Sequence, residues 1–563
     1  MAQIAKNIAP KDSTKLFKIV GLVLLLVLVF VSISVYTYQK LEKPTIGVDD
    51  ANIFFVYSRN LAEGHGFVYN IGGERVEGFT SLLWVLIGAI FFYLSNRPEF
   101  FLLAINIIFV VVTNVIAIKY IYRMHRDRKD IVILLAYLII LLIVPDYIVW
   151  MTFPLMETGL WSFLLTITAI TVLSVAGNSG WKYSLFLSLL IGTMLLTRPE
   201  AIVWGALYIL LTGLQVVFIA DHRKALWVIG FPVITYCATI VLLTIFRLLY
   251  FGYPLPNTYY AKVSPSFLYN LEVGFEYFLS YINSGFLFAV VVFCTIVFFS
   301  KDLYKFIHLW RVRTDRHKQV QTILQNFTLG AICVTGLVLP ILPGGDHFNS
   351  FRFYQPIYPL LIVYFIVSWI PLMGNRLHSR WVSLIVLVTV AFFVNFTHDV
   401  TWQNVGEKGK SILVEFRVAE RGREQGILLT NIFLDLEEYP SIGTVTSGAF
   451  KMTYPGDVID LMGLNNLQMG HSPGLREGTK NHAAFDSGVF FTLQPQIVGR
   501  KCDELKTQYL PGLSEDQKFH NLYECVNIKK IGVNGIYQAW IRVDFLARLY
   551  EDDQFKIEPV SYE

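Results

Sequence analysis

A long succession of apolar runs is the feature that most constrains this sequence. The first extends from about Ile19 to Tyr36, and comparable runs recur as far as residue 397. No single soluble core needs so much apolar surface, because 54% of the 563 residues are hydrophobic and only 16% are charged. The pattern predicts a polytopic α-helical membrane protein. The later runs lie near 81–95, 100–122, 131–150, 157–175, 182–197, 201–219, 226–250, 285–300, 321–340, 357–372 and 381–397.

Basic clusters predict the orientation of these runs. The first run is too long for the core of a signal peptide, and no small-residue cleavage site follows it, so we expect it to remain as a spanning helix. By the positive-inside rule, the clusters at 123–129, 221–224, 301–318 and 375–380 belong on the cytoplasmic side. The N-terminus is then cytoplasmic, and residues 37–80 lie outside.

Two apolar stretches are interpreted as helices that lie on the outer membrane surface. The 81–95 run is short for about 30 Å of hydrocarbon, and an odd number of crossings is needed before the basic cluster at 123–129. In the stretch 267–282, five apolar residues share one helical face. About eleven helices are then expected to cross the membrane. The five residues are Phe267, Leu271, Phe275, Phe278 and Ile282.

The character of the chain changes from residue 398 onward, where charges, glycines and prolines return. "GILLTNIFL" (426–434) and "GTVTSGAF" (443–450) are interpreted as strands, so residues 398–563 are expected to form a mixed α/β domain on the outer face. Cys502 and Cys525 are the only cysteine pair in this polar region, and they are disulfide candidates if it faces an oxidising compartment.

Polar residues gather at the predicted outer ends of different helices, whereas the helix centres carry almost no ionisable side chains. Each signal has a plain structural alternative: the adjacent Asp49 and Asp50 suit a solvated loop or a helix N-terminus, and "RPE" (198–200) suits an interfacial anchor. The histidines show no metal-ligand spacing, and the small net charge of +4 gives no nucleic-acid-binding face. Together, the acids and cations favour chemistry at the outer surface on a lipid with a charged head.

The stretch "DDANIFFVYSRNLAEGHGFVYNIGGERVEGFT" (49–80) resembles the first outer loop of GT-C glycosyltransferases, in particular the terminal β-(1→2)-arabinofuranosyltransferases of cell-wall arabinan. A more distant similarity is to lipid A aminoarabinose transferases. Two positions depart from the family pattern: Val56 stands where the family has Arg, and His347 where it has Trp. Further similar motifs follow in order: "METGLW" (156–161), "LLTRPEA" (195–201), "YFGYPLPNTYYAK" (250–262), "GGDHFNSFRFYQPIYPLL" (344–361) and "VIDLMGLNN" (458–466).

The resemblance implies a GT-C transmembrane catalytic module over residues 1–397, with the first outer catalytic loop and its juxtamembrane helix at 37–98. The implied reaction transfers a sugar from a polyprenyl-phosphate donor to a hydroxyl of a cell-envelope glycan or glycolipid, with inversion at the anomeric carbon. A carboxylate would act as general base, and Asp49 is the first choice, with Asp50 the close alternative. Cations would stabilise the leaving phosphate, and the candidates are Arg198, Lys262, Arg352 and Arg59.

The same resemblance implies residues that orient the sugar or the acceptor: Glu77, Glu157, Glu200, Asn257, Tyr259, Asp346 and His347. No metal ligand is assigned, although Glu77 and Glu157 could alternatively help to bind a divalent cation. The implied location is the bacterial inner membrane, with the site and the C-terminal domain on the periplasmic side. That domain either guides the acceptor or acts as a rigid cap. The competing functions are a lipid or glycan transporter, or flippase, and a non-catalytic glycan-binding protein.

Overall fold

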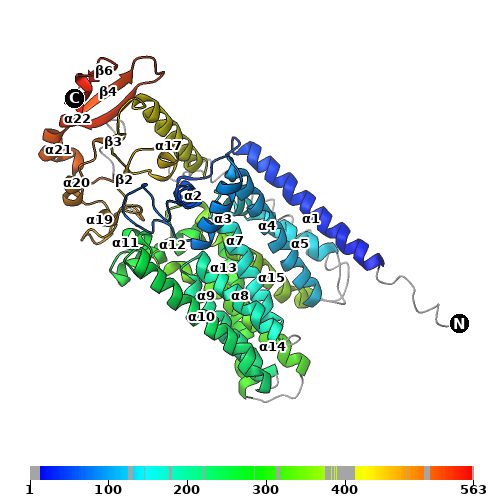
Figure 1. Cartoon of the computed structure of the whole chain (residues 1–563). Coiled ribbons are helices and arrows are strands. Elements are labelled where there is room, and N and C mark those ends of the chain that lie inside the picture. Colours follow the sequence, from blue (N-terminus) through cyan, green and yellow to red (C-terminus); the bar gives the residue numbers. More distant parts are fainter. Residues whose placement is uncertain are drawn as a thin grey trace.

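The computed structural model describes residues 13–124, 131–144, 146–175, 180–219, 222–284, 286–311, 317–373, 382, 386, 389, 412–478, 480–499, 502 and 508–560. Within these ranges the chain forms a helical body, up to residue 373, and a smaller domain of helices and strands from residue 412 onward (Figure 1). The smaller domain lies at one end of the body. The predicted boundary at residue 398 lies outside the described residues.

The helices of the body follow most of the predicted apolar runs. The run 131–150 is divided into two helices, because Asp146 adopts a left-handed conformation (φ 58°) between them. The helices are α1 (Ser13–Lys40), α2 (Asp49–Ala62), α3 (Leu82–Leu94), α4 (Pro98–Met124), α5 (Ile131–Ile143), α6 (Tyr147–Thr152), α7 (Thr158–Leu173), α8 (Trp181–Thr197), α9 (Ala201–Ile219), α10 (His222–Tyr250), α11 (Asn257–Lys262), α12 (Phe267–Asn283), α13 (Phe286–Arg311), α14 (His317–Val338) and α15 (Tyr358–Trp369).

Among the described residues, 4 helices are long and apolar enough to cross a membrane: Pro98–Met124, Ala201–Phe218, Trp227–Tyr250 and Gln319–Ile341. α12 and α13 form a further candidate, because together they are apolar enough for a broken span or a re-entrant loop with a bend of 106°. Several shorter apolar helices, including α7 and α8, pack among them. These helices fit a multi-pass membrane protein, but the predicted count of about eleven crossings is not confirmed. The predicted run 381–397 lies almost entirely outside the described residues.

The two stretches that were predicted to lie on the membrane surface both form helices. Within α3, Trp84 is buried, whereas Tyr93 is 80% exposed. Within α12, Tyr277 and Tyr281 are buried, whereas Phe267 is 62% exposed. Each helix therefore has an exposed apolar face, which an interfacial helix needs. Their location at the membrane surface remains a prediction.

The C-terminal domain contains a 6-stranded sheet with the order β2-β1-β3-β5-β4-β6. β1 pairs in parallel with β2 and β3, whereas the β3–β5, β4–β5 and β4–β6 pairs are antiparallel. The strands are β1 (Ile442–Thr444), β2 (Val458–Asp460), β3 (Ile497–Gly499), β4 (Tyr523–Lys530), β5 (Tyr537–Arg542) and β6 (Phe555–Pro559). The helices are α17 (Ile412–Ile432), α18 (Gly448–Thr453), α19 (Leu467–Gly470), α20 (Ser487–Leu493), α21 (Gln517–Leu522) and α22 (Val543–Tyr550).

The mixed α/β character of this domain agrees with the sequence, but one predicted strand is wrong. "GILLTNIFL" forms the last turns of α17, because buried positions recur at helical spacing through that stretch, at Gly422, Gly426, Leu429 and Ile432. "GTVTSGAF" is partly correct, since β1 includes its first two residues and α18 begins at Gly448.

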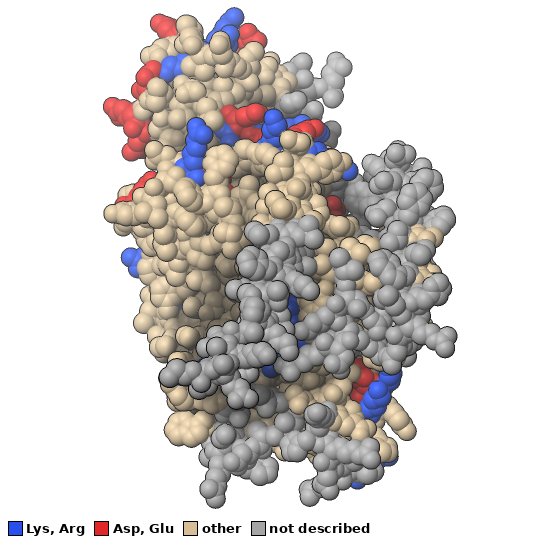
Figure 2. Space-filling model, turned by 90° about the vertical axis from the view of Figure 1, so that its right-hand side faces the viewer, with Lys and Arg blue, Asp and Glu red and all other residues tan. Residues whose placement is uncertain are grey.

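Helix α2 joins the two parts of the molecule. It packs against α3 of the body on one side and against α18 of the C-terminal domain on the other. The second contact is close, because a Cβ atom added to Gly448 would lie only 2.2 Å from the backbone oxygen of Asp49. Figure 2 shows that charged side chains gather over the C-terminal domain and along its boundary with the body, whereas the described surface of the body is mostly uncharged.

Candidate functional site

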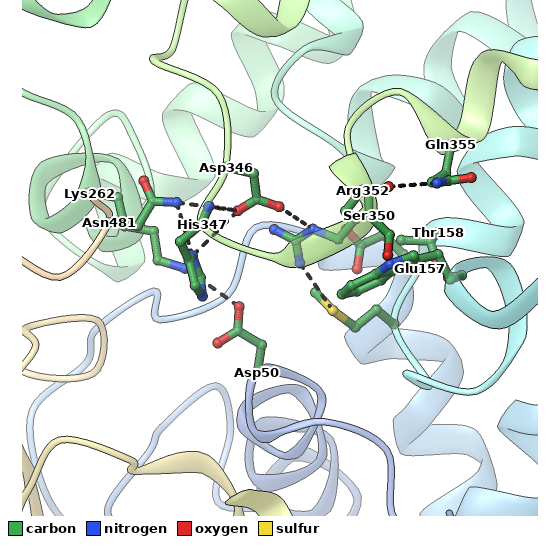
Figure 3. A network of polar contacts seen from close by, with 12 residues as sticks. Asp50, Glu157, Thr158, Lys262, Asp346, His347, Ser350, Arg352, Gln355 and Asn481 are labelled. Atoms are coloured by element: carbon green, nitrogen blue, oxygen red, sulfur yellow. Dashed lines mark hydrogen bonds and ion pairs between the residues drawn. The ribbon is translucent and has the colours of Figure 1, made fainter. Parts of the chain in front are cut away.

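Asp50 lies in the first turn of α2, where the helix N-terminus favours a negative charge. Its carboxylate faces the ammonium group of Lys262, at the end of α11, with a distance of 3.6 Å between Oδ2 and Nζ. Burial raises the pKa of Asp50, but the positive charges of Lys262 and Arg352 outweigh this effect, and the pKa falls below its usual value. Asp50 is therefore ionised at neutral pH and has a cation directly beside it (Figure 3).

Asp49 faces the C-terminal domain instead. Its carboxylate accepts hydrogen bonds from the backbone amides of Ala449 (2.8 Å) and Gly448 (3.3 Å) at the start of α18. Burial, together with the charges of Asp50 and Asp460, raises its pKa to about 7, even though these two hydrogen bonds favour the ionised form. The position of Asp49 supports a role in joining α2 to the C-terminal domain.

A second cluster of charges lies where α7 and α9 begin and α8 ends. Arg198 donates to Glu157 at 2.7 Å and to Glu200 at 2.8 and 3.2 Å. These two carboxylates outweigh the effect of burial and raise the pKa of Arg198, so its charge is permanent. Glu157 is fully buried, and within the described part of the chain its Oε2 atom has no hydrogen-bond partner. The acceptor capacity of that buried oxygen is unused within the described residues.

The segment "GGDHFNSFR" brings a third cluster to the same place. Arg352 donates through Nε to Asp346 at 2.7 Å and through Nη1 to the sulfur of Met156 (Figure 3). Asp346 also accepts from the backbone amide of His347. Arg352 and His347 together outweigh burial and hold the pKa of Asp346 well below its usual value. Asp346 is thus a buried anion that orients Arg352.

The backbone of this segment is unusual. Gly345 has a positive φ of 71°, and a Cβ atom there would lie 2.4 Å from the ring of Tyr277. Ser350 also has a positive φ, of 59°, which non-glycine residues rarely adopt. The Ser350 hydroxyl donates to Asp146, and the Ser350 carbonyl accepts from Gln355. These bonds hold the turn that aims Arg352 at the cluster (Figure 3).

All three clusters line one cavity of about 430 Å³, a size typical of small-molecule sites. Its polar walls contain Asp50, Glu157, Arg198, Glu200, Lys262, Asp346, Arg352 and Asn481. The remaining walls are largely apolar, and five of the large hydrophobic lining residues are more than a third exposed to the surroundings of the protein. They are Val203, Leu255, Tyr259, Phe267 and Leu342, and we call them the apolar rim. Charged residues thus line the interior of the cavity, and apolar residues surround its opening.

Five predicted site residues are not part of the lining of this cavity. Two of them, Asp49 and His347, are described above, and the other three are Arg59, Glu77 and Asn257. Arg59 donates to the Met452 carbonyl in α18. Glu77 accepts a bidentate pair of hydrogen bonds from Arg247 of α10, at 2.8 and 3.0 Å. Burial raises the pKa of Glu77 despite that partner. No local sequence pattern identified Met452 or Arg247 as a partner of these residues.

Asn257, the third of these residues, is buried at the start of α11. Its side-chain amide donates to the carbonyls of Gly463, Leu464 and Asn466 at 2.7, 3.0 and 3.2 Å. Because α11 also carries Lys262, these bonds tie the cavity's ammonium group to the C-terminal domain.

The C-terminal domain also supplies site residues that the sequence did not predict. The Asn481 amide donates to Asp346 at 3.3 Å and lies 3.2 Å from Nδ1 of His347 (Figure 3). The ring of His482 lies 4.5 Å from the ring of His347. Burial and the neighbouring His347 lower the pKa of His482 to about 4, so His482 is neutral at pH 7. Asn481 and His482 lie in "KNHAAF", whose only sequence signal is its polarity.

Two further predictions concern metals and cysteines. Within the described ranges, no group of three or more His, Cys, Asp and Glu side chains is arranged to hold a metal ion. The alternative role of Glu77 and Glu157 in binding a divalent cation stays a prediction. Cys502 and Cys525 are joined in a disulfide with a Cα–Cα separation of 6.0 Å, and the bridge connects β4 with the segment before it.

Comparisons with known proteins find only distant similarity. No protein-family model matches the chain, and no curated protein matches it. Among solved structures, it is similar to the oligosaccharyltransferase AglB of Archaeoglobus fulgidus in complex with an inhibitory peptide and a dolichol-phosphate, with 13% identity, a TM-score of 0.46 and coverage of 92% of this chain and 74% of that chain. The chain is also similar to the apo form of the Archaeoglobus fulgidus oligosaccharyltransferase, with 12% identity, a TM-score of 0.48 and coverage of 94% of this chain and 74% of that chain. Similarity at this level assigns no family.

Proposed function

We propose that this chain is a membrane glycosyltransferase that transfers a sugar from a polyprenyl-phosphate donor to a hydroxyl of a glycan or glycolipid acceptor. The observation that carries the proposal is the combination of charged depths with the apolar rim in one cavity. A ligand with a charged head and a long apolar tail fits this combination, because its tail can lie over the rim while its head reaches Lys262 and Arg352. The sequence resemblance to GT-C enzymes supports the same substrate class.

Asp50 is the better candidate for the general base. Its carboxylate lines the cavity and is ionised at neutral pH, whereas the carboxylate of Asp49 is engaged by two amides of α18. In the proposed reaction, Asp50 takes the proton from the acceptor hydroxyl as its oxygen attacks the anomeric carbon. The bond between that carbon and the phosphate oxygen breaks, and its electron pair leaves with the lipid phosphate. A single displacement of this kind inverts the anomeric centre.

Lys262 and Arg352 are the proposed partners of the leaving phosphate. Lys262 is 21% exposed at its side chain and makes a loose ion pair of 3.6 Å, so it can contact a second anion in the cavity. Arg352 is oriented by Asp346 through Nε and by Met156 through Nη1, and it lines the same cavity as Lys262. Cations fixed in advance stabilise charge that develops on the phosphate in the transition state.

Arg198 has a different proposed role from the one expected. Both of its guanidinium edges are already bound by Glu157 and Glu200, which makes it a scaffold for these carboxylates. The free Oε2 atom of Glu157 is then a suitable acceptor for a hydroxyl of the donor sugar. Glu157 therefore remains a candidate for sugar recognition, whereas Arg198 is a weaker candidate for phosphate binding.

The test compares sugar transfer by purified wild type, Asp50→Asn and Asp49→Asn, using radiolabelled polyprenyl-phosphate sugars and a membrane glycan extract. We expect Asp50→Asn to lower kcat by about 10²–10⁴-fold, the usual contribution of a general base. Asp49→Asn should retain most of its activity, because its neutral amide can still accept a hydrogen bond from α18. Thermal melting in detergent checks that both variants are folded.

Two outcomes would contradict the proposal. If Asp50→Asn retains full activity, the carboxylate is not the base. If wild type turns over none of the donors, the alternatives are a transporter and a glycan-binding protein. Uptake of a labelled polyprenyl-phosphate sugar across proteoliposomes would then identify the first of these.

A further inference from the structure

A second cavity, of about 490 Å³, lies on the polar side of α12. We call it the α12 groove. Four of its lining residues come from one stripe of the helix, because they recur at intervals of three and four residues. The opposite wall contains Lys480 and Gly478 of the C-terminal domain, and the amide of Gly478 donates to the Tyr269 hydroxyl across the groove at 3.2 Å. The stripe consists of Tyr269, Glu272, Glu276 and Ser280.

The α12 groove and the catalytic cavity are lined by consecutive residues of the C-terminal domain. Lys480 lines the groove, whereas its neighbour in the chain, Asn481, lines the catalytic cavity. The ammonium group of Lys480 lies 4.5 Å from the centre of the Tyr277 ring. Burial lowers the pKa of Lys480 to about 8, although Asp346 in the cavity and Glu276 in the groove both act to raise it. The Lys480 ammonium group thus interacts electrostatically with one acidic residue of each cavity.

The groove has the chemistry of a carbohydrate site. Glu272 and Glu276 are exposed, and among the described residues neither has an ion-pair partner within 4 Å, so both can accept hydrogen bonds from sugar hydroxyls. Tyr269 is half-buried and offers an aromatic face, and Lys480 offers donors. Two carboxylates beside one ammonium group disfavour an anionic ligand. The lining therefore favours a neutral, hydroxyl-rich ligand.

We propose that the α12 groove binds the carbohydrate of the acceptor next to the hydroxyl that reacts, which rests on the proposed glycosyl transfer. α12 then separates the two substrates. Phe267, at its start, belongs to the apolar rim over which the donor tail lies, whereas the stripe of Glu272 and Glu276 lies along the groove. The donor enters over an apolar surface, and the acceptor enters over a polar one.

The first measurement is the rate of transfer against acceptor concentration at saturating donor. The variant Glu272→Gln/Glu276→Gln should raise the acceptor KM about tenfold, because each carboxylate loses charge-assisted hydrogen bonds to hydroxyls. The donor KM and kcat should remain unchanged. Glu424→Gln, on the exposed surface of α17, is the matched control and should leave both KM values as in wild type. An unchanged acceptor KM in the double variant would overturn the proposal.

The second measurement does not depend on turnover. Binding of neutral tetrasaccharides of glucose, mannose and arabinose to the full chain in detergent is followed by saturation-transfer NMR. The proposal expects wild type and Glu424→Gln to bind at least one of them, and the double variant to bind it about tenfold more weakly. If wild type binds none, or the double variant binds equally well, the groove is not a carbohydrate site. If binding behaves as expected but no donor is turned over, the groove stands and the proposed transfer fails.

Discussion

Asp49 and Asp50 are neighbours in the sequence, but their carboxylates have different partners. Asp49 is bound by two amides of α18, and burial raises its pKa to about 7. Asp50 faces Lys262 in the cavity, and its pKa lies below the usual value. Asp50 is therefore the better-placed candidate for the proposed general base, because its carboxylate lines the cavity and carries its charge at neutral pH. The sequence had favoured Asp49, because spacing alone does not indicate which of two adjacent side chains faces a cavity.

The positive charge of Lys262 is the largest of those that lower the pKa of Asp50, and this predicts a pH effect. Removing the ammonium group with Lys262→Met should raise the pKa of Asp50, because the main charge that lowers it is lost. The acid limb of kcat/KM should then move to higher pH, so that activity fails at a pH at which wild type still works. The measurement is kcat/KM between pH 4 and pH 8.

Lys262→Arg is the matched control, since it keeps the positive charge and should leave the acid limb near its wild-type position. An acid limb that does not move in Lys262→Met would show that Asp50 is not the group whose protonation stops the reaction.

At the scale of elements, α2 and α11 connect the charged cavity to the C-terminal domain. α18 packs directly on the start of α2, and Asn257 binds three carbonyls of the segment before α19. His471 of the same domain lies between Tyr253 and Tyr260, with ring centroids 4.1 and 4.2 Å apart. The domain therefore holds the helices that carry Asp50 and Lys262.

The contact between α2 and α18 predicts a sharp effect of a small substitution. In Gly448→Ala, the new methyl group would lie 2.2 Å from the Asp49 oxygen and 2.9 Å from Ile53, so the two helices must move apart. We expect a loss of stability of about 1–3 kcal/mol, as for other overpacked sites, and a loss of transfer activity. The measurement is the melting temperature in detergent together with kcat.

Gly180→Ala is the matched control, because a Cβ atom at Gly180 would have no heavy atom within 4 Å and φ there is negative. Its melting temperature should stay close to that of wild type. If the melting temperature and kcat of Gly448→Ala match those of this control, neither stability nor activity depends on the close packing of α2 against α18.

At the scale of the whole molecule, the C-terminal domain lies at one end of the helical body (Figure 1). Its residues Asn481 and Lys480 line the cavity and the α12 groove, so both hollows are at this end. The charge pattern predicts that this end faces outward. Single cysteines can test this in a background in which Cys237, Cys294 and Cys333 are replaced by serine. In intact cells, a membrane-impermeant maleimide should label Glu424→Cys and should not label Lys305→Cys before the membrane is opened. Labelling of Lys305→Cys and not of Glu424→Cys would show that the C-terminal domain faces the cytoplasm, contrary to the prediction.

The sequence predicted much of this arrangement but not all of it. Asp50, Lys262, Asp346 and Arg352 line one cavity, as expected for polar residues at the same ends of different helices. Asn481 was missed, because it contacts Asp346 across 135 positions of chain and has no distinguishing spacing. The predicted strand at 426–434 failed for a related reason, since its local apolar composition suits either element and tertiary packing selects the helix.

The apolar rim has a consequence for how the reaction rate should be measured. If the donor reaches Lys262 over Val203, Leu255 and Phe267, its search takes place within the two dimensions of a leaflet. The rate then follows the mole fraction of donor among the lipids and not its amount per volume of buffer. Adding inert phospholipid at a fixed quantity of donor should slow transfer, whereas adding buffer should leave it unchanged. This surface dilution would distinguish a donor that enters sideways from one that enters from water.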